Sequence, residues 1–96
     1  MTDSIASRGQ VGLFAANLLT AVMGYAELAR SEDGNPDDQE ASAAAAERLE
    51  GLAGEAVKSR LITEAEGQTL RGSDRRAATN LALALKYEES PLPWGR

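Results

Sequence analysis

QVGLFAANLLTAVMGYAELAR, residues 10–30, is the longest apolar segment of this 96-residue chain, and the expected architecture follows from it. No charged residue lies between Arg8 and Glu27. At 100° per residue the apolar side chains cover more than half of the helix circumference. A helix with so wide an apolar face needs neighbours on two or three sides, so the segment predicts the central helix of a small bundle. That face contains Val11, Phe14, Leu18, Ala21, Val22, Tyr25 and Ala29, and the narrow stripe opposite contains Gln10, Asn17, Thr20, Gly24 and Glu27.

The same segment raises the question of a membrane. Its run of about 18 uncharged residues reaches the lower edge of a spanning helix. Against a span stand its many small residues, Asn17 in the middle, and the lack of a flanking Lys/Arg asymmetry. A secretory signal is also disfavoured, because Asp3 precedes a single Arg8 and no convincing cleavage site follows. We therefore expect a cytoplasmic protein with no membrane partner.

Helix-capping patterns predict the remaining elements. Asn35 followed by Pro36 is typical of a helix start, Thr63 and Glu66 form a capping box, and Ser73 precedes the last helical pattern. Gly72 is expected just beyond the end of the third helix. No run alternates with period two over the length of a strand. The prediction is a single all-α domain with a loose lead-in at 1–7, helices at 8–30, 36–59, 64–71 and 74–89, and an extended tail at 90–96.

Composition argues against catalysis. The chain contains neither cysteine nor histidine, which removes thiolate nucleophiles, the commonest general base and the commonest metal ligands. Asp37, Asp38 and Glu40 could act as an acid/base pair or hold a hard cation, but the EF-hand spacing is missing. Acids in a first helical turn are expected from the helix dipole alone. We predict no enzyme, no catalytic residue, no cofactor and no metal site.

Charge is distributed unevenly along the chain, whose net charge is −5. Residues 27–55 carry a local net charge of −7, and residues 56–86 carry +3. A dense acidic surface can occupy the basic groove of a nucleic-acid-binding protein in place of the phosphate backbone, although it can also be a solvated helix face. The expected partner-binding residues are Glu32, Asp33, Asp37, Asp38, Glu40, Glu47 and Glu50, with Asn17 and Glu27 from the polar stripe of the first helix.

A helix-turn-helix DNA-binding regulator is the first alternative. The segments 64–71 and 74–86, joined by a short turn, have suitable lengths, and Arg71, Arg75 and Arg76 would meet phosphates. The sequence NLALALK in the second of these helices offers few polar side chains to read base edges, and the overall charge opposes DNA binding. Direct nucleic-acid binding is therefore the less favoured expectation.

A local resemblance gives a second alternative. The segment NLLTAVMGYAEL, residues 17–28, resembles the first dimerisation helix of sensor histidine kinases. The position of the phospho-accepting histidine in that family is Leu13 here, and the acidic residue next to it would be Phe14. The resemblance therefore implies helix pairing without phosphotransfer, as in a structural subunit that dimerises through its first helix.

In general character the chain resembles phage-encoded anti-CRISPR proteins, which are small and often acidic and act without an active site. This resemblance implies a phage or mobile-element origin. Together with the charge distribution it predicts a non-enzymatic inhibitor that engages a basic, nucleic-acid-binding protein. The sequence leaves open whether Trp94 anchors a partner or folds back onto the core.

Overall fold

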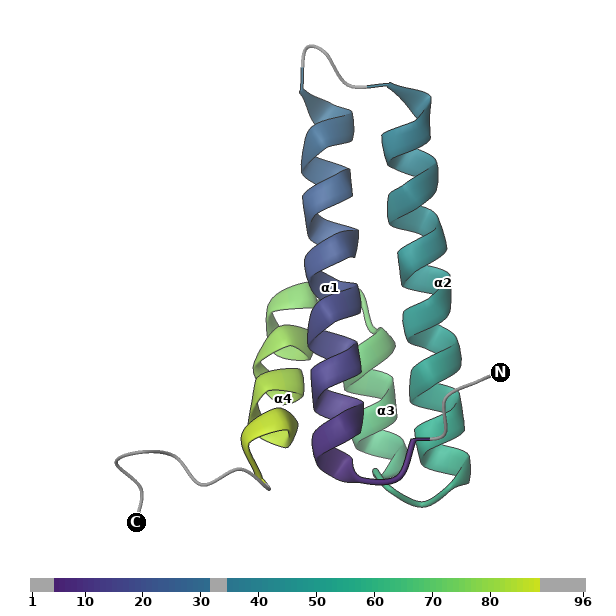
Figure 1. Ribbon diagram of the computed structural model, residues 1–96, viewed down its shortest axis with the longest axis vertical. Helices are drawn as coiled ribbons and strands as arrows, with labels where there is room; N and C mark the ends of the chain where they lie inside the picture. The colour runs from purple at the N-terminus through teal and green to yellow at the C-terminus, as the bar shows by residue number, and fades with distance from the viewer. Residues whose placement is uncertain (1–4, 32–34, 89–96) are drawn as a thin grey trace.

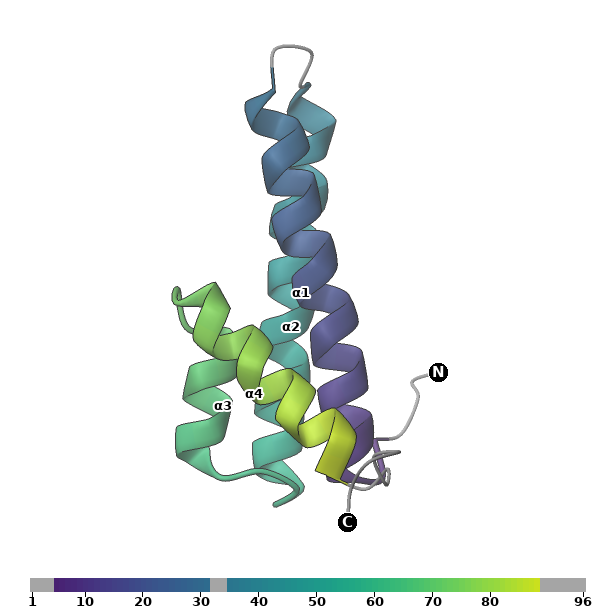
Figure 2. The same ribbon diagram turned by 90° about the vertical axis from the view of Figure 1, so that its left-hand side faces the viewer.

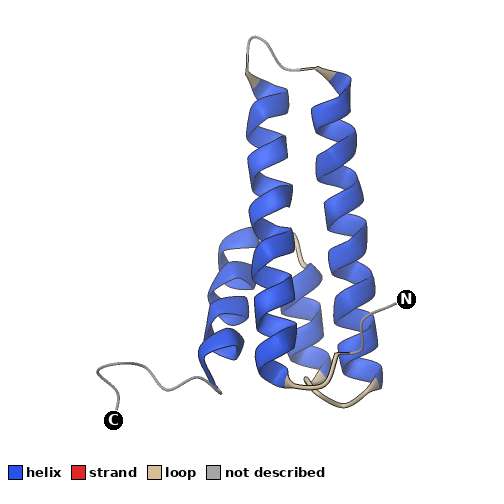
Figure 3. Ribbon diagram, in the orientation of Figure 1, coloured by secondary structure: helices blue, strands red, loops and turns tan. Residues whose placement is uncertain are grey.

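The computed structural model describes residues 5–31 and 35–88, and within them every regular element is an α-helix (Figure 3). The helices are α1 (Arg8–Arg30), α2 (Pro36–Lys58), α3 (Glu64–Arg71) and α4 (Arg75–Glu88). The predicted all-α fold is thus confirmed. Glu32, Asp33, Trp94 and the tail at 90–96 lie outside the described residues.

Two layers make up the molecule. The long helices α1 and α2 run antiparallel, and the shorter α3 and α4 pack against the half of this pair that contains the start of α1 (Figure 1). In the view of Figure 2, α3 lies on one side of the pair and α4 crosses from that side to the start of α1. Because α1 packs against both α2 and α4, it has the predicted central position.

Helix starts follow from local side-chain caps. The Ser7 hydroxyl accepts from the Gln10 N–H at 3.1 Å, and the Asn35 side chain accepts from the Asp37 N–H at 2.8 Å. Both halves of the capping box between Thr63 and Glu66 are formed. These bonds satisfy N–H groups that have no partner within the helix. The predicted cap at Ser73 is wrong: the Asp74 carboxylate accepts from the Ala77 N–H at 3.1 Å, so α4 begins at Arg75.

Helix ends were harder to predict. Gly72 directly follows α3, as expected, but its backbone is extended (φ −77°, ψ 170°) and not in the left-handed conformation that glycine often adopts after a helix. At the end of α2 the left-handed position is taken by Arg60, with φ 63°. There the Leu61 N–H donates to the Ala56 carbonyl and the Arg60 N–H donates to the Val57 carbonyl, both at 2.9 Å. This is the Schellman pattern, which ordinarily places glycine where Arg60 stands.

The core is aliphatic and rich in alanine. Its largest fully buried side chains are Leu19, Leu49, Leu70, Leu85 and Val11, which come from all four helices. No polar or charged residue is buried among the described residues. On α1 the buried line is Val11, Ala15, Leu19 and Val22, a narrower stripe than the sequence suggested. Phe14, Leu18 and Ala21 are half-buried, while Tyr25 and Leu28 are exposed.

Gly12 allows α1 and α4 to pack in close contact. A Cβ atom at this position would lie 2.5 Å from the Ala82 carbonyl oxygen and 2.8 Å from the Leu85 carbonyl carbon, and closer still to the Lys86 nitrogen. All three are backbone atoms, which cannot move aside without shifting α4. Glycine is therefore required where the two helices cross.

By length and hydropathy alone, α1 is able to span a membrane, and it is the one such helix within the described part of the chain. The core helix of a soluble protein passes the same test, as does a signal sequence. Only 28% of its most apolar 18-residue window is buried within the molecule. The helix therefore presents apolar surface beyond what its neighbours cover.

Candidate interaction surfaces

An acidic row runs along the outside of α2. Glu40, Glu47 and Glu50 are all exposed, on the side of the helix away from its buried line of Ala45, Leu49, Ala53 and Ala56. Glu40 and Glu47 are separated by two helical turns and so share one face. Neither they nor Glu50 form an ion pair or a side-chain hydrogen bond with any described residue. We call these three residues the acidic row.

The other predicted acidic residues are not in this row. Asp37 and Asp38 occupy the first turn of α2, where their backbone N–H groups donate to Asn35, and Asp38 is half-buried. Carboxylates there complement the helix dipole. Asn17 and Glu27 are exposed, as expected, but they belong to α1. Of the nine residues predicted to bind a partner, the structure therefore groups three.

Two of the predicted DNA-contacting arginines lie beside acidic residues. Arg71 and Arg75 line a shallow pocket of about 260 Å³ with Glu47 and Glu50 of the acidic row. Arg75 also donates to the Gly72 carbonyl at 3.4 Å. Carboxylates so near the two guanidinium groups lower the positive potential that a phosphate would meet. This end of the acidic row is thus partly balanced, whereas Glu40 does not line the pocket.

The outward face of α4 offers little for reading bases. It presents Arg76, Asn80, Leu83 and Tyr87, of which the last two are large apolar residues with 38% and 45% of their surface exposed. The Lys86 ammonium lies 5.1 Å from the centre of the Tyr87 ring. Arg76 is exposed and does not line the pocket that contains Arg71 and Arg75. The three arginines therefore do not form one basic patch.

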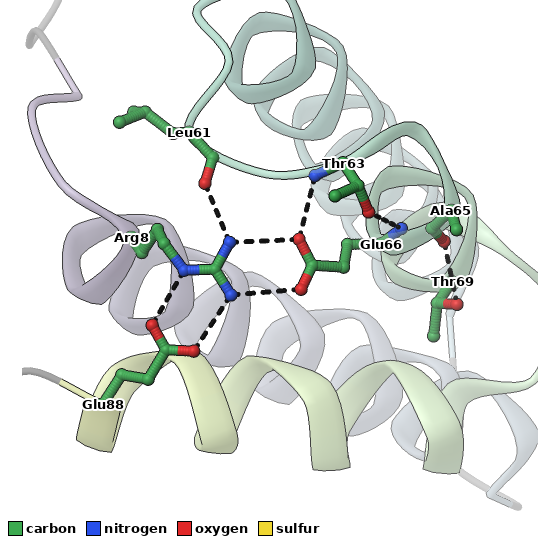
Figure 4. Close-up of polar contacts among 7 residues, drawn as sticks. All are labelled: Arg8, Leu61, Thr63, Ala65, Glu66, Thr69 and Glu88. Carbon is green, nitrogen blue, oxygen red and sulfur yellow. Dashed lines mark hydrogen bonds and ion pairs between the residues drawn. The ribbon is translucent and has the colours of Figure 1, made fainter.

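A polar cluster around Arg8 was not anticipated from the sequence (Figure 4). The guanidinium donates to both Glu66 carboxylate oxygens at 3.1 Å, to the Leu61 carbonyl at 3.0 Å, and to the two Glu88 oxygens at 2.8 and 2.9 Å. These five bonds tie the start of α1 to the α2–α3 loop, the start of α3 and the end of α4. Planar bidentate pairing of this kind is specific to arginine.

The Arg8 cluster shifts the acidities of its members. Hydrogen bonds from Arg8 lower the pKa of Glu66, and the Thr63 N–H lowers it further. The Arg8 hydrogen bond likewise lowers the pKa of Glu88, while the two carboxylates raise the pKa of Arg8. Every donor of the guanidinium is used, and its partners come from 53 to 80 residues away in sequence. The cluster has the form of a structural clamp, and no short-range sequence signal could have revealed it.

A wider groove lies between α1 and α2 beyond the start of α4. It has a volume of about 540 Å³ and is lined mainly by small side chains, together with Arg30, Gln39 and Arg75. Among the described residues, no three Asp or Glu side chains gather closely enough to hold a metal ion.

Comparisons with protein families, with curated proteins and with solved structures find no match to the chain.

Proposed function

We propose that this protein is a non-enzymatic inhibitor, encoded by a phage or a mobile element, that binds the basic surface of a nucleic-acid-binding protein and occludes it. The acidic row on α2 carries the proposal. It is exposed, it lies on a rigid helix, and its carboxylates are free of ion pairs within the described residues. Carboxylates spaced along one helix face can substitute for part of a phosphate backbone.

The rigidity of α2 supports this assignment. Its buried line of alanine and leucine packs against the core, and its first turn is capped by Asn35, so the acidic row is held without contacts of its own. Because the helix that carries the row is already ordered, only the glutamate side chains lose conformational entropy on binding. Glu40 is the member of the row that does not line the pocket with Arg71 and Arg75, so we expect it to contribute most.

Charge reversal tests the proposal. In the Glu40→Lys variant we expect capture of basic partner proteins from cell extract to be lost, with the helical circular dichroism spectrum retained. The matched control is Glu64→Lys, which makes the same change in net charge at an exposed position of α3 outside the row. The control should capture the same proteins as the wild type. Equal capture by both variants would contradict a role for the acidic row.

A nucleic-acid mobility-shift experiment addresses the helix-turn-helix alternative. The inhibitor proposal predicts no shift of DNA or RNA by the protein alone at moderate salt, since its net charge is −5. A shift that disappears in an Arg71→Ala/Arg76→Ala variant would instead assign the function to the basic residues.

A further inference from the structure

We propose that a second copy of this chain docks on the side of the α1–α2 pair that faces away from α3 and α4. The α1–α2 pairs of the two copies would then pack face to face, as two layers of two helices each. The surface concerned is an outer stripe on α1, composed of Phe14, Leu18, Ala21, Tyr25 and Leu28. Their spacing alternates between four and three residues, the pattern by which one helix packs along another. It is distinct from the buried line through Val11, Ala15 and Val22.

Rotation about the helix axis places the outer stripe. Gly12 faces α4, and the stripe lies between about 160° and 240° round α1 from Gly12. On α2, Val57 faces Gly67 of α3, and Ala41, Arg48 and Leu52 lie between about 180° and 220° round that helix. Both sets therefore belong to the side of the pair opposite α3 and α4, which no described helix covers (Figure 2).

Burial along the outer stripe is incomplete. Phe14, Leu18 and Ala21 are half-buried against the rest of the molecule, whereas Tyr25 and Leu28 keep 41% and 53% of their surface exposed. Large apolar side chains repeated along one helix face are a feature of interaction surfaces. The half of the pair near Tyr25 and Leu28 also extends past α3 and α4, so a second layer there would give those side chains the neighbours they lack (Figure 1).

Three arguments identify the occupant as a second copy. First, copies with a net charge of −5 repel one another, and α1 carries no charge from residue 9 to residue 26, so contact along this helix brings no like charges together. Second, the exposed residues Arg48 and Glu55 of α2 have opposite signs, so a two-fold axis allows Arg48 of each copy to pair with Glu55 of the other.

The third argument is area. A helix of 23 residues is about 34 Å long, and a face two helices wide spans about 20 Å, which gives roughly 700 Å² per copy. Two copies would bury about 1,400 Å², within the range of stable specific interfaces. The acidic row lies round α2 from this face and would stay accessible, so each dimer would display two such rows.

Sedimentation velocity with the full chain tests the dimer between about 1 and 300 µM, a range wide enough to detect a micromolar dissociation constant. We expect the wild type to sediment at twice its monomer mass of 10.1 kDa. Tyr25→Glu/Leu28→Glu should weaken association by at least about 100-fold, because two charges would enter an apolar contact. Its circular dichroism spectrum should remain that of the wild type.

The chain provides a closely matched control. Leu83→Glu/Tyr87→Glu changes the same residue types at similar exposure, but on the outward face of α4. This variant should remain a dimer. A wild type that is monomeric over the whole range would overturn the proposal and leave the face to a different partner, and equal loss of association in both variants would place the interface elsewhere. Neither result depends on whether the acidic row binds a basic protein.

Discussion

Gly12 and Gly24 of α1 lie in opposite surroundings, one in close contact with α4 and the other open. Replacing each with alanine therefore distinguishes the effect of close packing from that of helix propensity. Gly12→Ala should lower the free energy of unfolding by about 2–3 kcal/mol, because the new methyl group would collide with the α4 backbone. Gly24→Ala should raise it by about 0.5–1 kcal/mol, because the site is open and alanine favours the helix. Urea unfolding followed by circular dichroism measures both. If the two substitutions had equal effects, the contact between α1 and α4 would be wrong.

Arg60 is a second residue whose backbone determines the result of a substitution. A non-glycine residue in the left-handed region is strained, so Arg60→Gly should stabilise the fold by about 1 kcal/mol. Ser59→Gly is the matched control, since Ser59 has ordinary right-handed angles (φ −82°, ψ 0°) and should gain nothing. Thermal unfolding of the two variants distinguishes these outcomes, and a loss of stability in Arg60→Gly would refute the Schellman geometry.

At the scale of the element, the sequence predicted helices well where the signal is local. The caps at Ser7, Asn35 and Thr63 depend on residues within one helical turn, so they could be identified without the fold. Asp74 and Ser73 are both good caps, and only the structure shows that Asp74 accepts the hydrogen bond. The ends of α2 and α3 were harder to predict, because glycine is only preferred, and not required, at the left-handed position after a helix. Arg60 takes that position after α2, and Gly72 is extended after α3.

The orientation of α1 could be predicted only in part. Periodicity shows that more than half of the helix is apolar, but it cannot say which sector meets α2 and α4. The structure selects the sector of Val11, Ala15 and Leu19, and Gly12 explains the choice, since only there can α4 approach closely. The acidic row could be predicted from helical spacing. Its proximity to Arg71 and Arg75 could not, because it depends on how α3 and α4 pack.

The Arg8 cluster links three helices, and its removal should be detected as a change in the pH dependence of stability. Arg8→Met should lower the free energy of unfolding by about 1–2 kcal/mol at pH 7, a modest value because the cluster is partly exposed. The pKa values of Glu66 and Glu88 are lowered in the folded state, so the unfolded chain binds protons more readily. The wild type should therefore lose this stability as the pH falls below about 4.5.

Urea unfolding at pH 7 and pH 3.5 measures this difference. The wild type should lose more stability between the two pH values than Arg8→Met, since the variant lacks the interaction that lowers the two pKa values. Parallel losses in the two proteins would show that the guanidinium does not hold the carboxylates in solution.

For the whole molecule, the two proposals give different functions to two surfaces of the α1–α2 pair. The outer stripe of α1 would join copies, and the acidic row of α2 would face a basic partner. The Arg8 cluster and the Gly12 contact hold α3 and α4 against the start of α1. Alanine predominates in the core, so each buried residue contributes little area and the close helix contacts matter correspondingly more.

The central claim, occlusion of a nucleic-acid-binding surface, is tested most directly by displacement. A basic protein captured by the wild type is first bound to labelled nucleic acid. The inhibitor, as wild type or variant, is then titrated into this complex while the fluorescence anisotropy of the nucleic acid is followed. We predict that the nucleic acid is released at near-stoichiometric amounts of wild type and of Glu64→Lys, but not of Glu40→Lys. Anisotropy that stays constant with the wild type, or release by all three proteins alike, would contradict the account.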